Sequence, residues 1–265
     1  MLKLKDAKKI FNQDTINEKV ALKDVDLQMN LGEFITVIGS NGAGKSTLLN
    51  VIAGNHQLTN GEVLIDDQNL TGVPDFDRAH LVSRVFQDPL QGTAASMTIA
   101  ENLVLALRRN AKLNLSSGVT DERRDIFREE LSILNLGLED RLDDKVGLLS
   151  GGQRQALTLV MATIQEPSVL LLDEHTAALD PKTAQKIIDI TKEIVAHHNL
   201  TTVMVTHDLD HALELGTRTI MMDNGRIVLD VEDEERKDMT IDDLLEKFAK
   251  VSGHELTNDR ILLAQ

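Results

Sequence analysis

A glycine-rich motif in the first fifth of the chain constrains the fold more than any other feature. Residues 39–46 have the sequence Gly-Ser-Asn-Gly-Ala-Gly-Lys-Ser, which matches the pattern G-x-x-x-x-G-K-[ST]. The β-branched and aromatic run Phe34–Gly39 predicts a buried strand before it, and apolar residues at helical spacing up to Gly54 predict a helix after it. A strand, a loop and a helix in this order are the context in which the motif binds phosphate.

The chemistry of this loop follows from its residue types. Glycines let consecutive backbone N–H groups turn toward a polyphosphate, and the helix N-terminus adds its positive dipole end. We expect Lys45 to neutralise the β- and γ-phosphates and Ser46 to place its hydroxyl on Mg²⁺. A glycine-rich turn without a ligand is the alternative, which the flanking strand and helix disfavour. The other expected phosphate-loop residues are Gly39, Ser40, Asn41, Gly42, Ala43, Gly44 and Thr47.

Buried-strand patterns alternate with helical patterns along the chain. Further strands are predicted over 168–173 and 202–206, and between them Asp180-Pro181 indicates the start of an amphipathic helix. This alternation predicts an α/β fold with a mostly parallel core sheet. The stretches 20–27 and 61–66 alternate like antiparallel strands and predict an N-terminal β subdomain.

Three other segments give simpler indications. The stretch 89–147 carries helical patterns over 99–109 and 121–134 and predicts a helical insertion. The acidic run 230–235 is most simply a solvated segment, and 240–250 predicts a short amphipathic helix.

Two acids end the second predicted strand. The apolar run 169–172 leads directly into Asp173 and Glu174. A carboxylate at the tip of a buried strand is costly to leave unpaired, so a metal ion beside the phosphate loop is its natural partner. Asp173 fits the Mg²⁺ role, and Glu174 is placed to orient or deprotonate an attacking water. The alternative, two acids that cap the next helix, loses most of its weight beside a phosphate loop.

Composition excludes several classes of protein. The 265 residues include no Cys, Trp or Tyr and carry a formal charge of −15. Disulfides, thiolate nucleophiles and Cys-ligated metals are therefore excluded. Six Phe residues are too few for base-stacking platforms, and the acidic balance disfavours nucleic acid as a partner. The longest apolar runs fall far short of the roughly 20 residues of a membrane helix, so we expect a soluble cytosolic chain.

A second serine- and glycine-rich helix start lies at 149–153, with the sequence Leu-Ser-Gly-Gly-Gln. Ser150, Gly151, Gly152 and Gln153 offer another potential anion site. One chain has little need for two γ-phosphate cradles. We therefore expect this site to serve the nucleotide of a second copy.

Taken together, these motifs resemble the ATP-binding-cassette (ABC) ATPases over nearly the whole chain. The matching segments, in order, are Walker A (39–46), the Q-loop (85–89), the signature (149–153), Walker B (169–174), the D-loop (178–180) and the switch histidine His207. The resemblance implies a P-loop NTPase ABC nucleotide-binding domain over 1–265. Its parts would be a catalytic core with the β subdomain (1–88 and 154–265) and a helical subdomain (89–153).

The resemblance also implies an ATPase that uses ATP and Mg²⁺ in a head-to-tail homodimer. Gln87 would touch Mg²⁺ and the lytic water, and His207 would contact the γ-phosphate. Ser150 and Gly152 would close over ATP on the opposite subunit, with Asp180 along the dimer seam. The implied catalytic set is Glu174, His207, Gln87 and Lys45, and the implied metal set is Ser46, Gln87 and Asp173.

Two residues keep alternative roles. ABC ATPases commonly stack adenine on an upstream aromatic residue, and Phe11 either takes that role or belongs to the core. His175 stands where many relatives have Pro or Ala. It either tunes Glu174 or fills the turn, and we favour the turn.

The residues within and around these motifs are similar to those of the ATPase subunits of bacterial amino-acid importers. The resemblance is closest to the tryptophan/tyrosine type, which is related to the branched-chain type. This implies integral membrane permease subunits as partners, an extracytoplasmic solute-binding protein as an indirect partner, and a peripheral position on the cytoplasmic side of the membrane. We expect the permease to dock on segment 87–97. A cytosolic ABC ATPase of iron–sulfur cluster assembly is the alternative.

Overall fold

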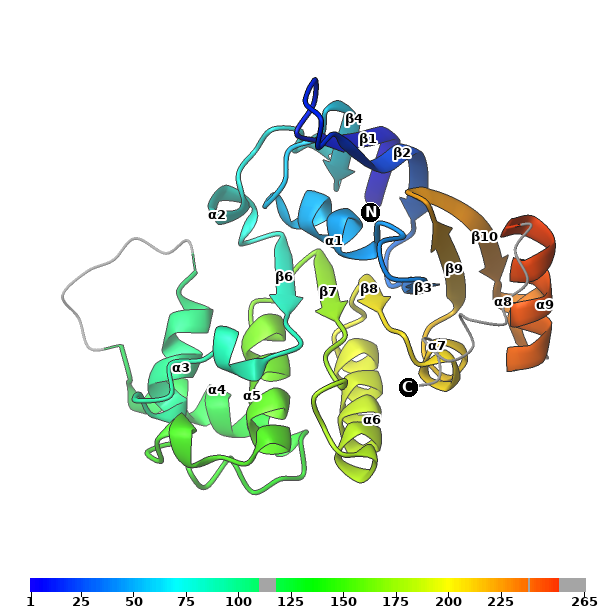
Figure 1. The fold of residues 1–265 in the computed structure, drawn as a ribbon. Coiled ribbons are helices and arrows are strands. Elements are labelled where there is room, and N and C mark those ends of the chain that lie inside the picture. Colours follow the sequence, from blue (N-terminus) through cyan, green and yellow to red (C-terminus); the bar gives the residue numbers. More distant parts are fainter. Residues whose placement is uncertain (110–117, 238, 253–265) are drawn as a thin grey trace.

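A six-stranded sheet forms the centre of the computed structural model, which describes residues 1–109, 118–237 and 239–252 (Figure 1). Its strand order is β10-β9-β3-β8-β7-β6. Five strands run parallel and only β10 is antiparallel to its neighbour. The predicted mostly parallel core is therefore confirmed. The strands are β3 (Phe34–Gly39), β6 (Val82–Val85), β7 (Val169–Asp173), β8 (Thr202–Val205), β9 (Arg218–Asp223) and β10 (Arg226–Glu232).

A second sheet is antiparallel and N-terminal, with the order β2-β1-β4-β5. The two stretches predicted as antiparallel strands fall in β2 and β4, but both pair with the first strand instead of with each other. Its strands are β1 (Leu2–Phe11), β2 (Lys19–Met29), β4 (Asn60–Ile65) and β5 (Gln68–Asn69).

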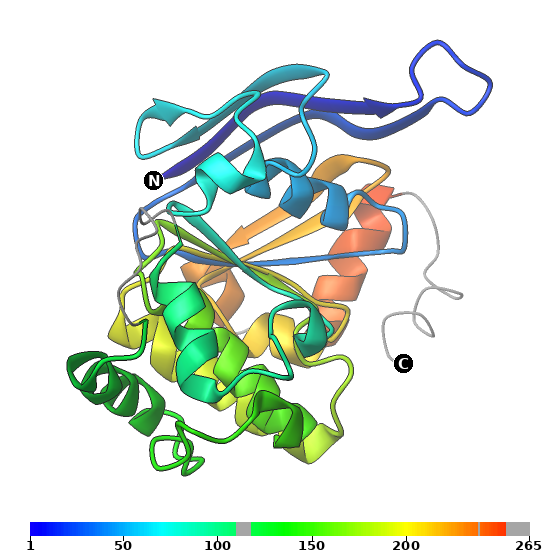
Figure 2. The ribbon, with the colours of Figure 1, turned by 90° about the vertical axis from the view of Figure 1, so that its left-hand side faces the viewer.

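The helices are arranged around the central sheet. Figures 1 and 2 show α1 between the two sheets and α3 to α6 on the other face of the central sheet. The helices are α1 (Lys45–Ala53), α2 (Asp75–Arg78), α3 (Ile99–Leu107), α4 (Asp121–Ser132), α5 (Gly151–Thr163), α6 (Pro181–His197), α7 (Leu209–Glu214), α8 (Asp233–Lys237) and α9 (Ile241–Ser252), with 3₁₀ turns η1 (Pro89–Gln91) and η2 (Val146–Leu148).

Both faces of the central sheet are apolar because alternate residues of its strands point to opposite sides. Ile35 and Leu171 pack in the cluster that includes α1. Phe34, Leu170 and Leu172 pack in the cluster that includes α3 to α6. Burial on both faces explains why these strands are continuous hydrophobic runs. Their parallel pairing places their carboxyl ends at one edge of the sheet.

The segment between β6 and β7 is helical, as its sequence predicts. Its described residues, which omit 110–117, form helices, 3₁₀ turns and one isolated bridge between Thr98 and Lys145. The two expected helices are α3 and α4, each ending two residues early.

The acidic run 230–235 differs from its expectation as a simple solvated segment. It completes β10 and begins α8. Asp230 and Glu232 are exposed, but Val231 between them is buried, and Asp230 forms an ion pair with Arg218. The alternation of one buried residue between two acids is that of an edge strand.

Among the residues that the structure describes, no helix combines the length and apolar character needed to cross a membrane.

Candidate functional site

The residues predicted to carry chemistry follow the carboxyl ends of three adjacent parallel strands. The phosphate loop follows β3, Asp173 ends β7 with Glu174 directly after it, and His207 follows β8. Ligands of open α/β sheets bind at this edge. The fold thus brings together groups that are up to 168 positions apart in the sequence.

Close backbone contacts require glycine in the phosphate loop. At Gly39, φ is +142° and a Cβ would lie 2.2 Å from the carbonyl oxygen of Met222. At Gly44, φ is +110° and a Cβ would lie 2.7 Å from the carbonyl oxygen of Ala21. No side chain among the described residues caps α1, so its first N–H groups remain available to an anion.

Lys45 is held over the loop that precedes it. Its Nζ donates hydrogen bonds to the carbonyl oxygens of Gly39 (2.6 Å) and Ser40 (3.1 Å), and the residue is only 7% exposed. Burial lowers the pKa of the Lys45 ammonium, and the carboxylates of Glu174 and Asp173 oppose that shift. A phosphate in the loop would give this buried cation a directly bonded anionic partner.

A pocket of about 180 Å³ extends from the loop to β1. Phe11 lies on its wall, with Lys9 Nζ 5.0 Å from the ring centroid and the His56 ring edge-on at 5.1 Å. Phe11 is part of neither large apolar cluster of the described residues. The pocket is lined by Phe11, Lys19, Ala21, Asn41, Gly42, Ala43, Gly44, Lys45, Ser46, Thr47 and Glu174.

Glu174 and His207 form the charged pair of the site. Glu174 Oε2 lies 3.6 Å from His207 Nδ1, and the Glu174 amide donates to the Val205 carbonyl at 3.0 Å. Contact with His207 lowers the pKa of the Glu174 carboxyl, outweighing burial. The same contact raises the pKa of His207. The arrangement favours an ionised carboxylate and a protonated imidazole side by side.

Asp173 has a partner that the sequence reasoning missed. Arg84, on the neighbouring strand β6, donates from Nη2 to Asp173 Oδ2 at 2.5 Å and from Nη1 to Asn50 Oδ1 at 2.7 Å. Gln87 lines the same pocket of about 420 Å³ as Asp173. An arginine three residues before that glutamine was the available signal, but its partner depends on which strand lies beside β6.

The signature segment, residues 149–153, lies outside the phosphate pocket of its own chain. Ser150 is the N-cap of α5: its Oγ accepts from the Gln153 amide, and Gln153 Oε1 accepts from the Ser150 amide, both at 3.2 Å. Asp180 caps α6 by accepting from the Thr183 amide at 3.1 Å. The residues described as lining the phosphate pocket include no member of 150–153 and not Asp180.

Gly152 has a structural reason to be glycine. A Cβ at this position would lie 2.4 Å from the Thr183 Cγ2 methyl group. The first turns of α5 and α6 therefore approach too closely for any other residue without a shift.

His175 is buried in the turn after β7. Its Nε2 lies 3.1 Å from Thr191 Oγ1, whose own proton goes to the Ile187 carbonyl, so Nε2 is the donor. Burial, and secondarily the charge of His211, lowers the pKa of His175 to about 3. A neutral, packed imidazole agrees with the interpretation that His175 fills the turn.

Comparisons with known proteins identify the family of this chain. Residues 22–177 match the family model described as ABC transporter. The tyrosine transport ATP-binding protein of Clostridioides difficile (strain R20291) is 45% identical over 248 residues, covering 94% of this chain and 98% of the relative.

Solved structures show the same fold. An ATP-binding cassette of an ABC transporter in its ADP conformation superposes with a TM-score of 0.78 at 27% identity, covering 96% of this chain and 99% of its own. A dimeric cassette in a post-hydrolysis state with ADP and Pi gives a TM-score of 0.73 at 32% identity, covering 88% and 98%. Nothing in these comparisons favours the iron–sulfur cluster assembly ATPase. The chain belongs to the ABC transporter family and is one of its ATP-binding, ATP-hydrolysing subunits.

Proposed function

We propose that this chain hydrolyses Mg²⁺-bound ATP in a head-to-tail dimer and thereby drives a membrane permease that imports amino acids. One observation carries the dimer: the phosphate loop, Walker B acids and switch histidine converge within one chain, whereas the signature segment lies outside their pocket. A cassette solved as a dimer with ADP and Pi shares this fold.

The donor set suits magnesium that is held partly by a nucleotide. Ser46, Gln87 and Asp173 offer the hard oxygen ligands that Mg²⁺ takes, with a single carboxylate among them. Within the described ranges, no group of three or more His, Cys, Asp or Glu residues could hold a metal by itself. ATP phosphates would therefore complete the coordination shell. When bound, Mg²⁺ neutralises charge on the β- and γ-phosphates.

The protein groups divide the remaining work. Lys45 binds the β- and γ-phosphates, because it is a buried cation at the start of α1. Glu174, whose pKa is lowered, stays ionised and orients the attacking water as an acceptor. His207, whose pKa is raised, donates to the γ-phosphate. Phe11 provides a face for the adenine at the far end of the pocket.

The second copy supplies the opposite wall. The Ser150 hydroxyl accepts from the Gln153 amide, so its proton remains available to a γ-phosphate of the partner's nucleotide. Asp180, the N-cap of α6, lies next to this segment and is exposed, as a residue at a dimer seam must be before assembly.

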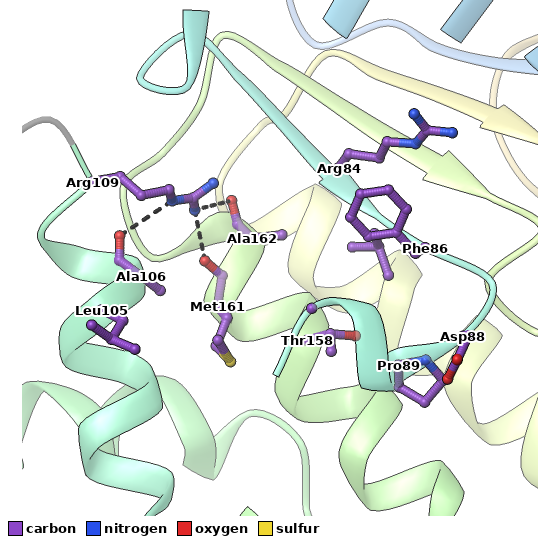
Figure 3. Close-up of a pocket in the computed structure, with 12 residues that line it drawn as sticks. Arg84, Phe86, Asp88, Pro89, Leu105, Ala106, Arg109, Thr158, Met161 and Ala162 are labelled. Carbon is purple, nitrogen blue, oxygen red and sulfur yellow. Dashed lines mark hydrogen bonds between the residues drawn. The ribbon is translucent and has the colours of Figure 1, made fainter. Parts of the chain in front are cut away.

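The permease is proposed to dock beside the Q-loop. A pocket of about 230 Å³ lies between β6, η1, α3 and α5 (Figure 3). Leu90 on η1 and Leu105 on α3 are 53% and 54% exposed, and Leu105 lines this pocket. The docked subunit would sit at the cytoplasmic face of the membrane, with 89–153 as the helical subdomain that contacts the permease and 1–88 with 154–265 as the catalytic core.

Exchange of the catalytic carboxylate tests the ATPase mechanism. Glu174→Gln keeps the shape of the side chain but removes its charge, so hydrolysis should fall at least about 100-fold. ATP should still bind and hold the dimer together, which size-exclusion chromatography with ATP would show. Rapid ATP turnover in this variant would contradict the role of Glu174.

The solute is proposed to be an aromatic amino acid. The support for this choice is the tyrosine transport ATP-binding protein of C. difficile, since its match with this chain covers 98% of its length. Uptake of labelled tyrosine by cells that carry the chain with its permease should require intact Lys45. Tyrosine uptake that is unchanged in the Lys45→Ala variant would contradict the proposal.

A further inference from the structure

Arg84 stands between the two pockets that the proposed function uses. It lines the pocket that contains Asp173 and Gln87, and it also lines the pocket proposed for the permease. Figure 3 shows its side chain beside Phe86, with the guanidinium directed away from Arg109. Arg84 therefore connects the carboxylate of Asp173, proposed to bind Mg²⁺, with the pocket proposed for the permease.

The sheet register brings Arg84 to Asp173. In the parallel pairing of β6 with β7, Arg84 lies opposite Leu171, two residues before Asp173. Residues two apart on a strand point to the same face, so the long arginine side chain reaches forward along that face to the carboxylate. Its other terminal nitrogen is held by Asn50 on α1, the helix that carries Ser46.

The pair is largely shielded from water. The two side chains are 14% and 19% exposed. The guanidinium carbon lies 4.9 Å from the Phe86 ring centroid. A charged pair with this little exposure interacts more strongly than a surface pair, since water screens it less.

The resting contact leaves one donor unpaired. Arg84 Nε is buried and finds no acceptor among the described residues. An unpaired buried N–H costs free energy, so this position holds the guanidinium less firmly than a fully bonded one would. Asp173 is thus neutralised by a group that can leave.

We propose that Arg84 is an exchangeable counter-charge of Asp173: it positions the carboxylate when no cation is bound and competes with Mg²⁺ for it. This inference rests on the proposed magnesium role of Asp173. A divalent cation beside Asp173 repels the guanidinium, because like charges at short range disfavour each other.

A displaced Arg84 side chain would change its contacts with Phe86 and with the pocket proposed for the permease. Its guanidinium already contacts Phe86, which directly precedes Gln87, and the same side chain lines the permease pocket. Arrival of the cation therefore alters the wall of that pocket through one side chain. Arg84 is a positioning residue in this scheme, since it acts on ATP hydrolysis only through Asp173 and Phe86.

The first test is the Mg²⁺ enhancement of nucleotide binding, measured by calorimetry with a non-hydrolysable ATP analogue. The quantity compared is the ratio of the dissociation constant in EDTA to that in excess Mg²⁺. Arg84→Met should raise this ratio about fivefold, because it leaves Asp173 unpaired without the metal and removes the competitor when the metal is present. Arg84→Lys retains the charge and should keep the ratio within about twofold of the wild type.

Two controls separate the possible failures. Arg128→Met removes a half-exposed arginine that pairs with Asp125 on α4, and it should leave the ratio unchanged. If Asp173→Asn lowers the ratio while Arg84→Met matches Arg128→Met, the inference about Arg84 is wrong and the magnesium role stands. A wild-type ratio near one that Asp173→Asn does not alter would instead overturn the magnesium role.

The second test detects movement of Arg84 by the fluorescence of a tryptophan placed beside it. The chain contains no Trp or Tyr, so Phe86→Trp introduces a unique indole beside the guanidinium. Its emission should shift when the analogue binds with Mg²⁺ but not when it binds in EDTA. The same Mg²⁺-specific shift in the Phe86→Trp/Arg84→Met double variant would overturn the proposal. Melting temperatures of all variants, compared with that of Arg128→Met, identify any that fail to fold.

Discussion

The two glycine-rich helix starts of this chain, at α1 and at α5, differ in how their N–H groups are satisfied. The first turn of α1 follows Gly44 and receives no side-chain cap from the described residues. The first turn of α5 is capped reciprocally by Ser150 and Gln153. An uncapped helix start is incomplete without an anion, whereas a capped one is stable alone. The two helix starts therefore fit the proposed division of roles, in which the phosphate loop binds the nucleotide of its own chain and the signature segment that of a second copy.

Their surroundings differ in the same sense. The α1 site includes buried Lys45 and the Glu174 and His207 pair. Ser150 and Gly151 at the start of α5 are exposed. The same local motif, a helix N-terminus with glycines, thus lies in two different electrostatic environments because of the charges that the fold places around it.

The largest expected effect comes from blocking the exposed helix start. Ser150→Arg should lower the steady-state ATPase rate at least about 100-fold, the scale of losing a preorganised donor in the transition state. Nucleotide binding to the isolated subunit should stay unchanged, because Ser150 does not line the phosphate pocket. The arginine also removes the N-cap, at a cost of about 1 kcal/mol, so a melting curve accompanies the assay. Wild-type hydrolysis would break the shared-site model.

Gly152 gives an intermediate effect on stability. Gly152→Ala places a Cβ 2.4 Å from the Thr183 methyl group and should lower the free energy of unfolding by about 1–3 kcal/mol, measured with urea. Thr183→Ser removes that methyl group and should restore stability in the double variant.

Gly151→Ala is the matched control, since its Cβ would make an ordinary 3.7 Å contact with Leu179. A stable Gly152→Ala/Thr183→Ser protein without ATPase activity would show that the partner's nucleotide also requires glycine here. A Gly152→Ala protein as stable as the Gly151→Ala control would refute the packing argument.

The smallest effect is a pH dependence of stability that belongs to the α1 site. The raised pKa of His207 makes its contribution full below about 6.5 and lost as the pH rises through the folded-state value. The lowered pKa of Glu174 makes its contribution full above about 4.5 and lost as the pH falls. The pair is partly exposed, so the gain is at most about 1 kcal/mol.

The raised pKa of His207 and the lowered pKa of Glu174 together define a pH range in which the pair stabilises the fold most. The melting temperature of the wild type should exceed that of His207→Ala by the most between about pH 4.5 and 6.5. The difference should shrink toward pH 9. The four residues 150–153 contain no titratable group, so Ser150→Ala should shift the melting temperature equally at all these pH values. A pH-independent difference for His207→Ala would contradict the charged pair.

Local sequence was sufficient for the elements whose signals lie within one short window. The helix start at Pro181, its N-cap Asp180 and the stop at Gly54 were all predicted and are confirmed. Strands β6 and β9 were missed, because each contains an arginine and depends on neighbours that are distant in the sequence. The acidic strand β10 was missed for a different reason: it lies at the edge of the sheet, and Val231 is its one fully buried residue, between two acids.

The sequence by itself was enough to predict ATPase chemistry, because the phosphate loop, the acid pair and the signature are each encoded in residues adjacent along the chain. Only the tertiary structure decided which charges meet. Arg84 reaches Asp173 because β6 pairs with β7 in one register, and Gly152 must be glycine because α6 approaches α5. Pairing and approach of distant segments depend on the packing of the whole sheet and its helices, which lies outside any short window of sequence.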